Sequence, residues 1–280
     1  MGKRKVDTLV EFEINARGLL DAFRVVNEFT EEAMFTFDSD GLWLQMLDPS
    51  HVAMIEWMLP RDCMEVYGFA GRNGKPFEVG VNVATVLRRF PKIRSVDDTV
   101  KVTITEWRER DDEKKLIRRG EWHYLYRNRR FTVSSLYLET DKLPRLRVSW
   151  RDYVSLTCRG FKSALEDFKK FGTDVVEMVL NDDEFIMKAD SYVEPYTGEL
   201  VNLTIRWDRT NNELLEIDCS KTRTGKYHLG WLISISKIDK LANTIRLSLA
   251  GTVNNPKPLK VTADTWVMGV FNFYIAPYVD

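Results

Sequence analysis

The chain has 280 residues, 44% of them hydrophobic and 30% charged, which favours a folded protein of one large or two medium domains over a disordered one. No run of about 18 apolar residues occurs, so the sequence predicts no membrane-spanning helix. The formal net charge is -1, from 41 basic and 42 acidic residues, so binding of a polyanion would have to depend on local clusters of basic residues.

Four segments show the periodicity of amphipathic helices, and most of the remaining chain alternates apolar and polar residues as strands do. The predicted helices span residues 16–29, 82–90, 159–171 and 227–241. Their buried faces include Leu87 in the second helix and Ile233 in the fourth. Their outer sides are basic, with Arg17, Arg24, Arg88, Arg89, Lys92, Lys162, Lys169, Lys170, Lys237 and Lys240. This recurrence favours a weak, sequence-independent attraction to nucleic acid, although surface helices often carry Lys and Arg for solubility alone.

The spacing of the helices indicates an internal duplication. A strand, a turn and a second strand follow the first helix within residues 33–46, and the same plan follows the third helix within residues 175–189. The sequence therefore predicts two similar domains, at residues 1–137 and 149–280. A linker at residues 138–148, where the strand pattern is interrupted, joins them.

Residues 107–130 mix many basic residues with Trp107, Trp122, Tyr124 and Tyr126. One interpretation is a nucleic-acid platform in which bases stack on the rings. The other is a long exposed hairpin whose Arg side chains cover the rings. Acidic residues in the same segment favour the hairpin.

The sequence offers little support for catalysis. No motif of a zinc site, hydrolase, P-loop or dinucleotide site surrounds the histidines and cysteines, which are His51, His123, His228, Cys63, Cys158 and Cys219. Asp182 and Asp183 are more typical of a turn than of a metal site. We therefore expect no enzymatic activity, no cofactor and no bound metal ion.

Two segments resemble a known family. Residues 32–53 contain DPSHV at 48–52, and residues 227–277 end in YIAP at 274–277. At this distance from each other they resemble the two ends of the proliferating cell nuclear antigen (PCNA) family of DNA sliding clamps, especially its archaeal form. The resemblance extends from about Leu9 onward. It implies an α+β DNA-clamp fold, with two similar domains of antiparallel sheets and two short helices each, assembled into a trimeric ring.

The resemblance also implies a function. The chain would be a processivity factor that encircles duplex DNA, with the basic helix residues facing the DNA and no contact with a membrane. Through short PIP-type peptides it would tether DNA polymerase, flap endonuclease, ligase and the clamp loader, in the cytoplasm at the nucleoid of an archaeon or in the nucleus of a eukaryote. The implied peptide pocket consists of Leu47, His51, Val52, Leu143, Pro144, Pro258, Tyr274, Ala276 and Pro277.

Ring closure in such an architecture requires edge strands that pair between subunits. We expect these strands at residues 130–138 and 184–189. The interface residues would be Val133, Ser135, Tyr137, Phe185 and Met187.

Some alternatives stay open at this point. The near-neutral charge and the basic 107–130 segment are compatible with a subunit of a heterotrimer, or with a clamp-like antagonist that regulates ring assembly. A nucleic-acid-processing enzyme is a rival from another class, but it would need a carboxylate or metal cluster, which the sequence does not suggest.

Overall fold

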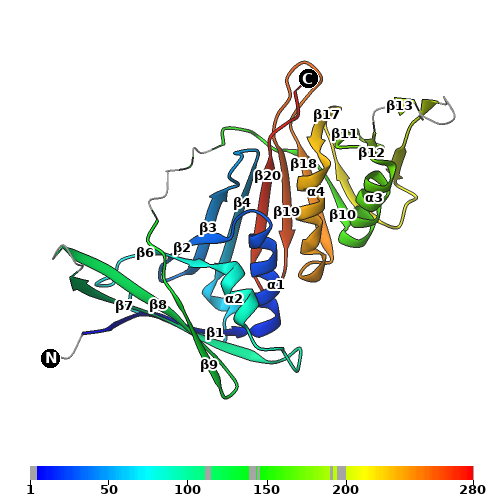
Figure 1. Cartoon of the computed structure of the whole chain (residues 1–280). Coiled ribbons are helices and arrows are strands. Elements are labelled where there is room, and N and C mark those ends of the chain that lie inside the picture. The colour runs from blue at the N-terminus through cyan, green and yellow to red at the C-terminus, as the bar shows by residue number, and fades with distance from the viewer. Residues whose placement is uncertain are drawn as a thin grey trace. The chain divides into compact units, whose positions relative to one another are not determined.

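The computed structural model describes residues 5–110, 115–138, 143, 146–189, 192–193 and 200–279 (Figure 1). The chain divides into two compact units. Unit 1 comprises Met1–Pro49, Ile55–Leu143 and Trp266–Val270, and unit 2 comprises Ser50–Met54, Pro144–Thr265 and Phe271–Asp280. The longest segment of unit 1 ends at Leu143, and the predicted domain boundaries at residues 137 and 149 stay a prediction. Among the described residues, no helix has the length and apolar character needed to cross a membrane.

The described residues of the first half of the chain form two α-helices, a short 3-10 helix and nine strands. In chain order these are β1 (Asp7–Asn15), α1 (Ala16–Asn27), β2 (Glu32–Phe37), β3 (Gly41–Leu47), β4 (Ala53–Pro60), η1 (Arg61–Cys63), β5 (Val66–Phe69), β6 (Phe77–Asn82), α2 (Val83–Arg89), β7 (Thr99–Arg110), β8 (Leu116–Tyr126) and β9 (Arg129–Ser134).

The second half has the same plan with one small additional hairpin. Its elements are β10 (Asp152–Thr157), α3 (Cys158–Phe171), β11 (Val175–Leu180), β12 (Glu184–Lys188), β13 (Tyr192–Val193), β14 (Leu200–Val201), β15 (Thr204–Asp208), β16 (Leu214–Asp218), β17 (Arg223–His228), α4 (Leu229–Ser236), η2 (Lys237–Lys240), β18 (Thr244–Leu249), β19 (Leu259–Asp264) and β20 (Val270–Ile275).

Strand order confirms the duplication. Five neighbouring strands run β5-β1-β7-β8-β9 in the first half and β16-β10-β18-β19-β20 in the second. Four further strands run β4-β3-β2-β6 and β15-β12-β11-β17 in the two halves. Pairings such as β1 with β7, β7 with β8 and β11 with β17 are antiparallel. The two helices of each half pack against each other. This is the α+β architecture that the sequence predicts.

The two halves also repeat in local detail. The Asn15 side chain accepts a hydrogen bond from Gly18 N (2.7 Å) at the start of α1, and Thr157 Oγ1 accepts one from Gly160 N (3.1 Å) at the start of α3. Such caps satisfy amide groups that the first helical turn leaves unbonded. Equivalent caps therefore fix the starts of equivalent helices.

Two residues predicted to be buried in helices are only half-buried. Leu87 lies near the end of the short helix α2, and Ile233 lies to the side of α4, whose buried residues include Leu229, Leu232 and Ile235. The predicted fourth helix also changes character along its length, because α4 ends at Ser236 and η2 continues it as a 3-10 turn.

The basic 107–130 segment forms the β7–β8 hairpin. Trp122, Tyr124 and Tyr126 are each at most 2% exposed, so their rings belong to the core of unit 1 and cannot stack on nucleic-acid bases. Arg118 and Arg119 form ion pairs within the hairpin, with Glu106 (3.4 Å) and Glu109 (2.9 Å). Trp107, the fourth aromatic residue of the segment, is half-buried, and its indole N–H donates to Glu109 (3.3 Å). Three of the four rings are therefore unavailable for the predicted platform, and the structure favours the hairpin interpretation.

A buried carboxylate connects the two strand groups of unit 2. Asp152, the first residue of β10, accepts hydrogen bonds from Ser220 N (2.7 Å), Ser220 Oγ (2.9 Å) and Arg223 Nε (2.6 Å). Ser220 lies in the connection from β16 to β17, so these bonds fix the path by which the chain crosses between the two groups.

Candidate functional site

Helix α1 presents two exposed cations that share one anion. The Arg17 Nε atom lies 3.9 Å from Asp21 Oδ2, and the Arg24 guanidinium donates to Asp21 Oδ1. Asp21 itself is buried. The outer side of α1 therefore keeps less positive charge than its sequence suggests.

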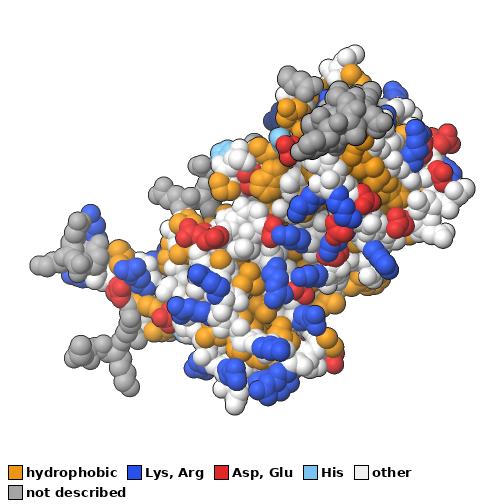
Figure 2. All heavy atoms as spheres, turned by 45° about the vertical axis from the view of Figure 1, so that its right-hand side comes forward, with side chains coloured by type: hydrophobic (Ala, Val, Ile, Leu, Met, Phe, Trp, Pro, Cys, Tyr) orange, Lys and Arg blue, Asp and Glu red, His pale blue; other side chains and the backbone are white. Residues whose placement is uncertain are grey.

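Helix α2 and the residues after it keep their full charge. Arg88, Arg89 and Lys92 are exposed, and among the described residues none of them has a carboxylate partner within 4 Å. Arg88 Nη2 donates only to Thr85 Oγ1 (3.2 Å). Figure 2 shows Lys and Arg side chains over much of the face drawn there, with Asp and Glu side chains among them.

In unit 2, Lys169 and Lys170 are exposed on α3 and Lys237 and Lys240 on η2. Lys170 Nζ lies 3.4 Å from Asp167 Oδ1, with both side chains more than half exposed, so this pair contributes little stability.

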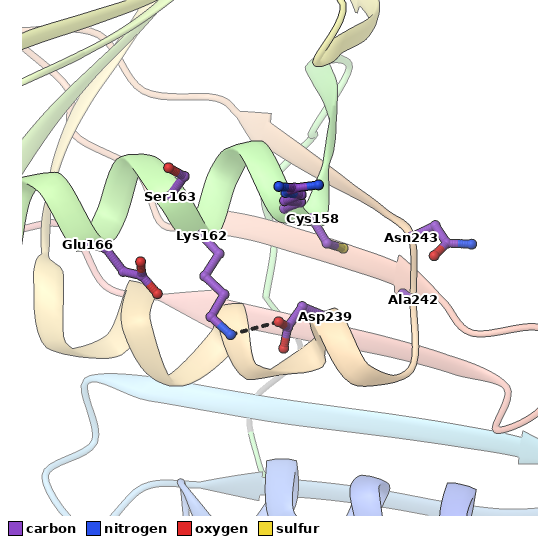
Figure 3. Close-up of a pocket in the computed structure, with 8 residues that line it drawn as sticks. Cys158, Lys162, Ser163, Glu166, Asp239, Ala242 and Asn243 are labelled. Carbon is purple, nitrogen blue, oxygen red and sulfur yellow. Dashed lines mark hydrogen bonds and ion pairs between the residues drawn. The ribbon is translucent and has the colours of Figure 1, made fainter. Parts of the chain in front are cut away.

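Lys162 is the least available of the predicted cations. Its Nζ atom donates to Asp239 Oδ2 over 2.7 Å, and the two side chains point toward each other from α3 and η2 (Figure 3). The hydrogen bond to Asp239 raises the pKa of Lys162. A pocket of about 440 Å³ surrounds this pair and also has Arg159, Glu166 and Cys158 in its lining. Its charges are mixed, so it has no marked preference for an anion or a cation.

Cys158 lacks the character of a nucleophile. Burial, together with the nearby charge of Asp239, raises the pKa of its thiol to about 12. A thiol with this pKa stays protonated near neutral pH, and the protonated form reacts poorly.

Sequence reasoning missed Arg159. It follows the Thr157 cap of α3 as Arg17 follows the Asn15 cap of α1, and both arginines are exposed. The repeat of a cap, one residue, Arg and Gly at 15–18 and 157–160 is visible in the sequence and could have revealed it.

Within unit 2, Trp150 connects several residues of the predicted peptide pocket. The Trp150 indole N–H donates to the Pro258 carbonyl (3.0 Å), and its ring lies 5.4 Å from the Tyr274 ring, tilted by 53°. Ala276 N donates to Val52 O (2.8 Å). Tyr274 and Pro258 are half-buried, and Lys260 Nζ lies 5.8 Å from the centre of the Tyr274 ring.

The hydrogen bond and the ring contact of Trp150 do not involve the other predicted pocket residues, which are His51, Pro277, Leu47 and Leu143. His51 is exposed with a positive φ of 59°, and Pro277 is half-buried. Leu47 and Leu143 are half-buried and belong to unit 1. Pro144 lies outside the described residues.

The structure shortens the first predicted interface strand. β9 lies at the end of its sheet, as an edge strand must. The strand ends at Ser134, although Ser135 N still donates to Gly120 O of β8 (2.9 Å). The chain then changes partner, because Leu136 exchanges two backbone hydrogen bonds with Gly80 of β6. The Val133 side chain is buried, and Tyr137 donates to Glu106 (3.2 Å).

The second predicted interface strand is wrong. β12 lies between β15 and β11, so it is not an edge. Phe185 and Met187 are fully buried, and the Phe185 ring lies 5.6 Å from Trp207 of β15. The end strands of this sheet are β15 and β17, and the one next to β12 is β15, whose side chains at Thr204, Arg206 and Asp208 are exposed.

Comparisons with known proteins agree with this fold. The family described as "Proliferating cell nuclear antigen, N-terminal domain" matches residues 10–118. "DNA polymerase sliding clamp 3" of Sulfurisphaera tokodaii is 24% identical over 271 residues, covering 95% of this chain and 98% of its own length. "DNA polymerase sliding clamp 1" of Pyrobaculum aerophilum is 23% identical over 256 residues, covering 91% and 92%.

Two solved structures share the fold. A chain of the PCNA2-PCNA3 complex from Sulfolobus tokodaii is similar with a TM-score of 0.75 and 21% identity, over 96% of this chain and 100% of its own. The Proliferating Cellular Nuclear Antigen of Entamoeba histolytica has the same TM-score at 16% identity, over 98% of this chain and 100% of its own.

Proposed function

We propose that this chain, which belongs to the family of PCNA-type DNA sliding clamps, is one subunit of a ring that encircles duplex DNA and tethers replication and repair enzymes to it. The observation that carries the proposal is the duplicated fold with exposed cations on or beside its helices: Arg17 and Arg24, Arg88 to Lys92, Lys169 and Lys170, Lys237 and Lys240. Such cations bind phosphates without reading sequence, which a sliding protein requires.

The ring would contain three subunits, either copies of this chain or related chains. The similarity to a chain from a complex of two different clamp proteins supports the second possibility. The exposed edges of β9 and β15 would pair between neighbours, because an unpaired strand edge readily binds another strand.

Reversing the charge of Arg88 and Lys170 together is expected to weaken retention on DNA. Each substitution removes one cation from a phosphate and adds a repulsive charge, so binding should fall roughly tenfold at low salt and the slope of log K against log salt should decrease by about 0.9 per cation removed. Retention on linear duplex DNA with blocked and open ends, measured by fluorescence at several salt concentrations, tests this expectation.

The matched control is Arg61→Glu with Lys75→Glu, which makes the same change in net charge at exposed positions outside the four helices. It should leave retention nearly unchanged. Equal retention of the unmodified ring on blocked and open linear DNA would contradict encirclement, and an equal loss in both double variants would show that the helices have no special part.

A peptide with a Gln followed by closely spaced hydrophobic and aromatic residues is expected to bind unit 2 at Tyr274. The small contact area suggests micromolar affinity, about -8 kcal/mol. Because Trp150 holds both Pro258 and Tyr274, Trp150→Ala should weaken binding as much as Tyr274→Ala does. Calorimetric titration of the peptide into the three proteins measures this effect.

Tyr153→Ala is the control for the loss of an aromatic ring in unit 2. The Tyr153 ring contacts Arg246 and its hydroxyl bonds Glu216 (2.7 Å), away from the Trp150 contacts. Binding that survives Tyr274→Ala unchanged would exclude the assigned pocket.

A further inference from the structure

A second pocket, of about 440 Å³, lies in unit 1 outside the helices. It is formed where the segment after α2 approaches the tight turn between β8 and β9. Its lining residues are Lys92, Arg94, Tyr126, Arg127, Asn128 and Arg129. Four of the six are cationic, and no acidic residue is among them, which distinguishes this pocket from the mixed one around Lys162.

Asp98 is not in the lining of the pocket, but it holds three of the lining residues, Arg94, Tyr126 and Arg127, in place by hydrogen bonds. The Asp98 carboxylate accepts hydrogen bonds from Tyr126 Oη, from Arg127 Nη2 (2.7 Å) and from the backbone N–H groups of Arg94 (3.3 Å) and Ser95 (3.0 Å). The hydrogen bonds from Arg127 and Tyr126 hold the pKa of Asp98 well below its usual value, so it stays charged. These bonds tie the segment after α2 to the end of β8.

Arg127 has a backbone conformation that is uncommon for a residue with a side chain. Its φ is 54°, in the left-handed region, as a two-residue hairpin turn between β8 and β9 demands. Its guanidinium is paired with Asp98, so the two charges largely cancel. Arg127 therefore shapes the pocket but adds little net charge.

Three cations remain uncompensated. The side chains of Lys92, Arg94 and Arg129 are exposed, and within the described part of the chain none of them has a carboxylate partner within 4 Å. Asn128 adds an amide that can donate two further hydrogen bonds. Three cations and an amide around one pocket can form charge-assisted hydrogen bonds to an anion. The best-suited anion carries one or two negative charges and several acceptor oxygens.

We propose that this pocket binds a phosphate group, and that in the working protein the phosphate belongs to the DNA backbone, an assignment that rests on the proposed clamp function. The exposed cations on the helices themselves lie on open surface, so a phosphate can move from one to the next, whereas Lys92 follows α2 and lines the pocket. A walled pocket with three cations favours residence of one phosphate at a time. The pocket would therefore add a localised contact to the diffuse attraction of the helices.

Inorganic phosphate is the first probe, titrated at constant ionic strength while backbone amide resonances of Asn128 and Arg127 are followed by NMR. Arg94→Gln with Arg129→Gln should weaken phosphate binding at least about tenfold, because hydrogen bonds to charged groups are strong. The control, Arg130→Gln with Arg61→Gln, removes the same charge from exposed positions outside the pocket and should change binding less than about twofold.

A short duplex oligonucleotide is the second probe, measured with the same variants by fluorescence anisotropy at several salt concentrations. The pocket variant should lower the slope of log K against log salt by about 0.9 for each phosphate that it no longer neutralises. Weaker duplex binding in the pocket variant but not in the control supports the assignment to DNA, whether or not inorganic phosphate binds detectably. If the pocket variant binds inorganic phosphate more weakly but binds the duplex as well as the control does, the phosphate pocket is supported and the assignment to DNA is overturned.

Equal behaviour of the pocket and control variants with both probes overturns the proposal. The double reversal of Arg88 and Lys170 separates that outcome from failure of the clamp function. If this helix variant loses DNA binding while the pocket variant does not, the clamp function stands and the phosphate pocket is wrong. If the pocket variant alone loses binding, the pocket stands and the helices do not face DNA.

Discussion

Proline at Ser134 is expected to abolish ring assembly and leave unit 1 folded, whereas proline at the next residue, Ser135, is expected to destabilise unit 1 itself. Ser135 N donates to Gly120 O of the chain's own β8. Hydrogen bonds alternate in antiparallel pairs, so the N–H groups of Ser134 and Thr132 point away from β8, toward the open edge. Proline removes the donor at whichever residue it replaces.

The two substitutions are chemically identical and adjacent, so each is the control for the other. Ser134→Pro should melt near the temperature of the unmodified protein but sediment as a monomer, alone or with related clamp chains of the same source. Ser135→Pro should lose about 1 to 3 kcal/mol of the free energy of unfolding, because it leaves a carbonyl without its donor. Normal assembly of Ser134→Pro would exclude β9 as an interface. An unmodified protein that stays monomeric in all mixtures would favour the antagonist alternative.

The same reasoning applies to β15. Ala189 N donates to Leu203 O, so by alternation the N–H groups of Thr204 and Arg206 point outward and that of Ile205 points toward β12. Thr204→Pro should therefore block assembly and Ile205→Pro should reduce stability.

The repeat, the four helices and the strands after the first and third of them could be predicted from the sequence, because each depends on short-range periodicity and turn chemistry. The turns predicted within residues 33–46 and 175–189 both form, and in each of them one side chain, Asp38 or Asn181, accepts two backbone N–H groups. The aromatic residues of 107–130 were ambiguous, since periodicity alone does not show which face of a hairpin meets the core.

The order of strands within a sheet depends on contacts between distant residues, and here prediction failed. The three apolar residues from Phe185 to Met187, between Glu184 and Lys188, are too short a run to show whether β12 has one neighbour or two. Its second neighbour, β15, begins sixteen residues after β12 ends and has only Trp207 as a buried residue. The role of Trp150 was likewise hidden, because its contacts with Pro258 and Tyr274 span more than 100 residues of sequence.

Replacing Asp152 by Asn is expected to lower the free energy of unfolding by about 3 kcal/mol at neutral pH, the low end for breaking a buried ion pair. The Asp152 side chain is 3% exposed and its partner Arg223 is 23% exposed, so the substitution leaves a largely buried guanidinium without its anion. The Asn side chain also accepts hydrogen bonds only through its oxygen, because its nitrogen is a donor. It therefore cannot accept the hydrogen bonds of Ser220 and Arg223 at two different atoms, as the carboxylate does. Urea unfolding of the two proteins at pH 7 measures the difference.

The difference between the two proteins should also depend on pH. Burial alone would raise the pKa of Asp152, but the hydrogen bonds from Ser220 and Arg223 outweigh it and lower the pKa below the ordinary value of 3.8. A carboxyl whose pKa is lower in the folded state stabilises the protein above the unfolded value and loses this contribution as pH falls through the folded value. The advantage of the unmodified protein over Asp152→Asn should therefore be constant above about pH 5 and shrink below about pH 4.

Asp208→Asn provides the matched control in the same unit. Hydrogen bonds from Thr210 also lower the pKa of Asp208, but this residue is exposed and forms no ion pair with any described residue. Its replacement should change stability by less than about 0.5 kcal/mol, as is usual for surface substitutions. An equally small effect of Asp152→Asn would mean that the packing of apolar residues fixes the path from β16 to β17. The ion pair between Asp152 and Arg223 would then contribute little to stability.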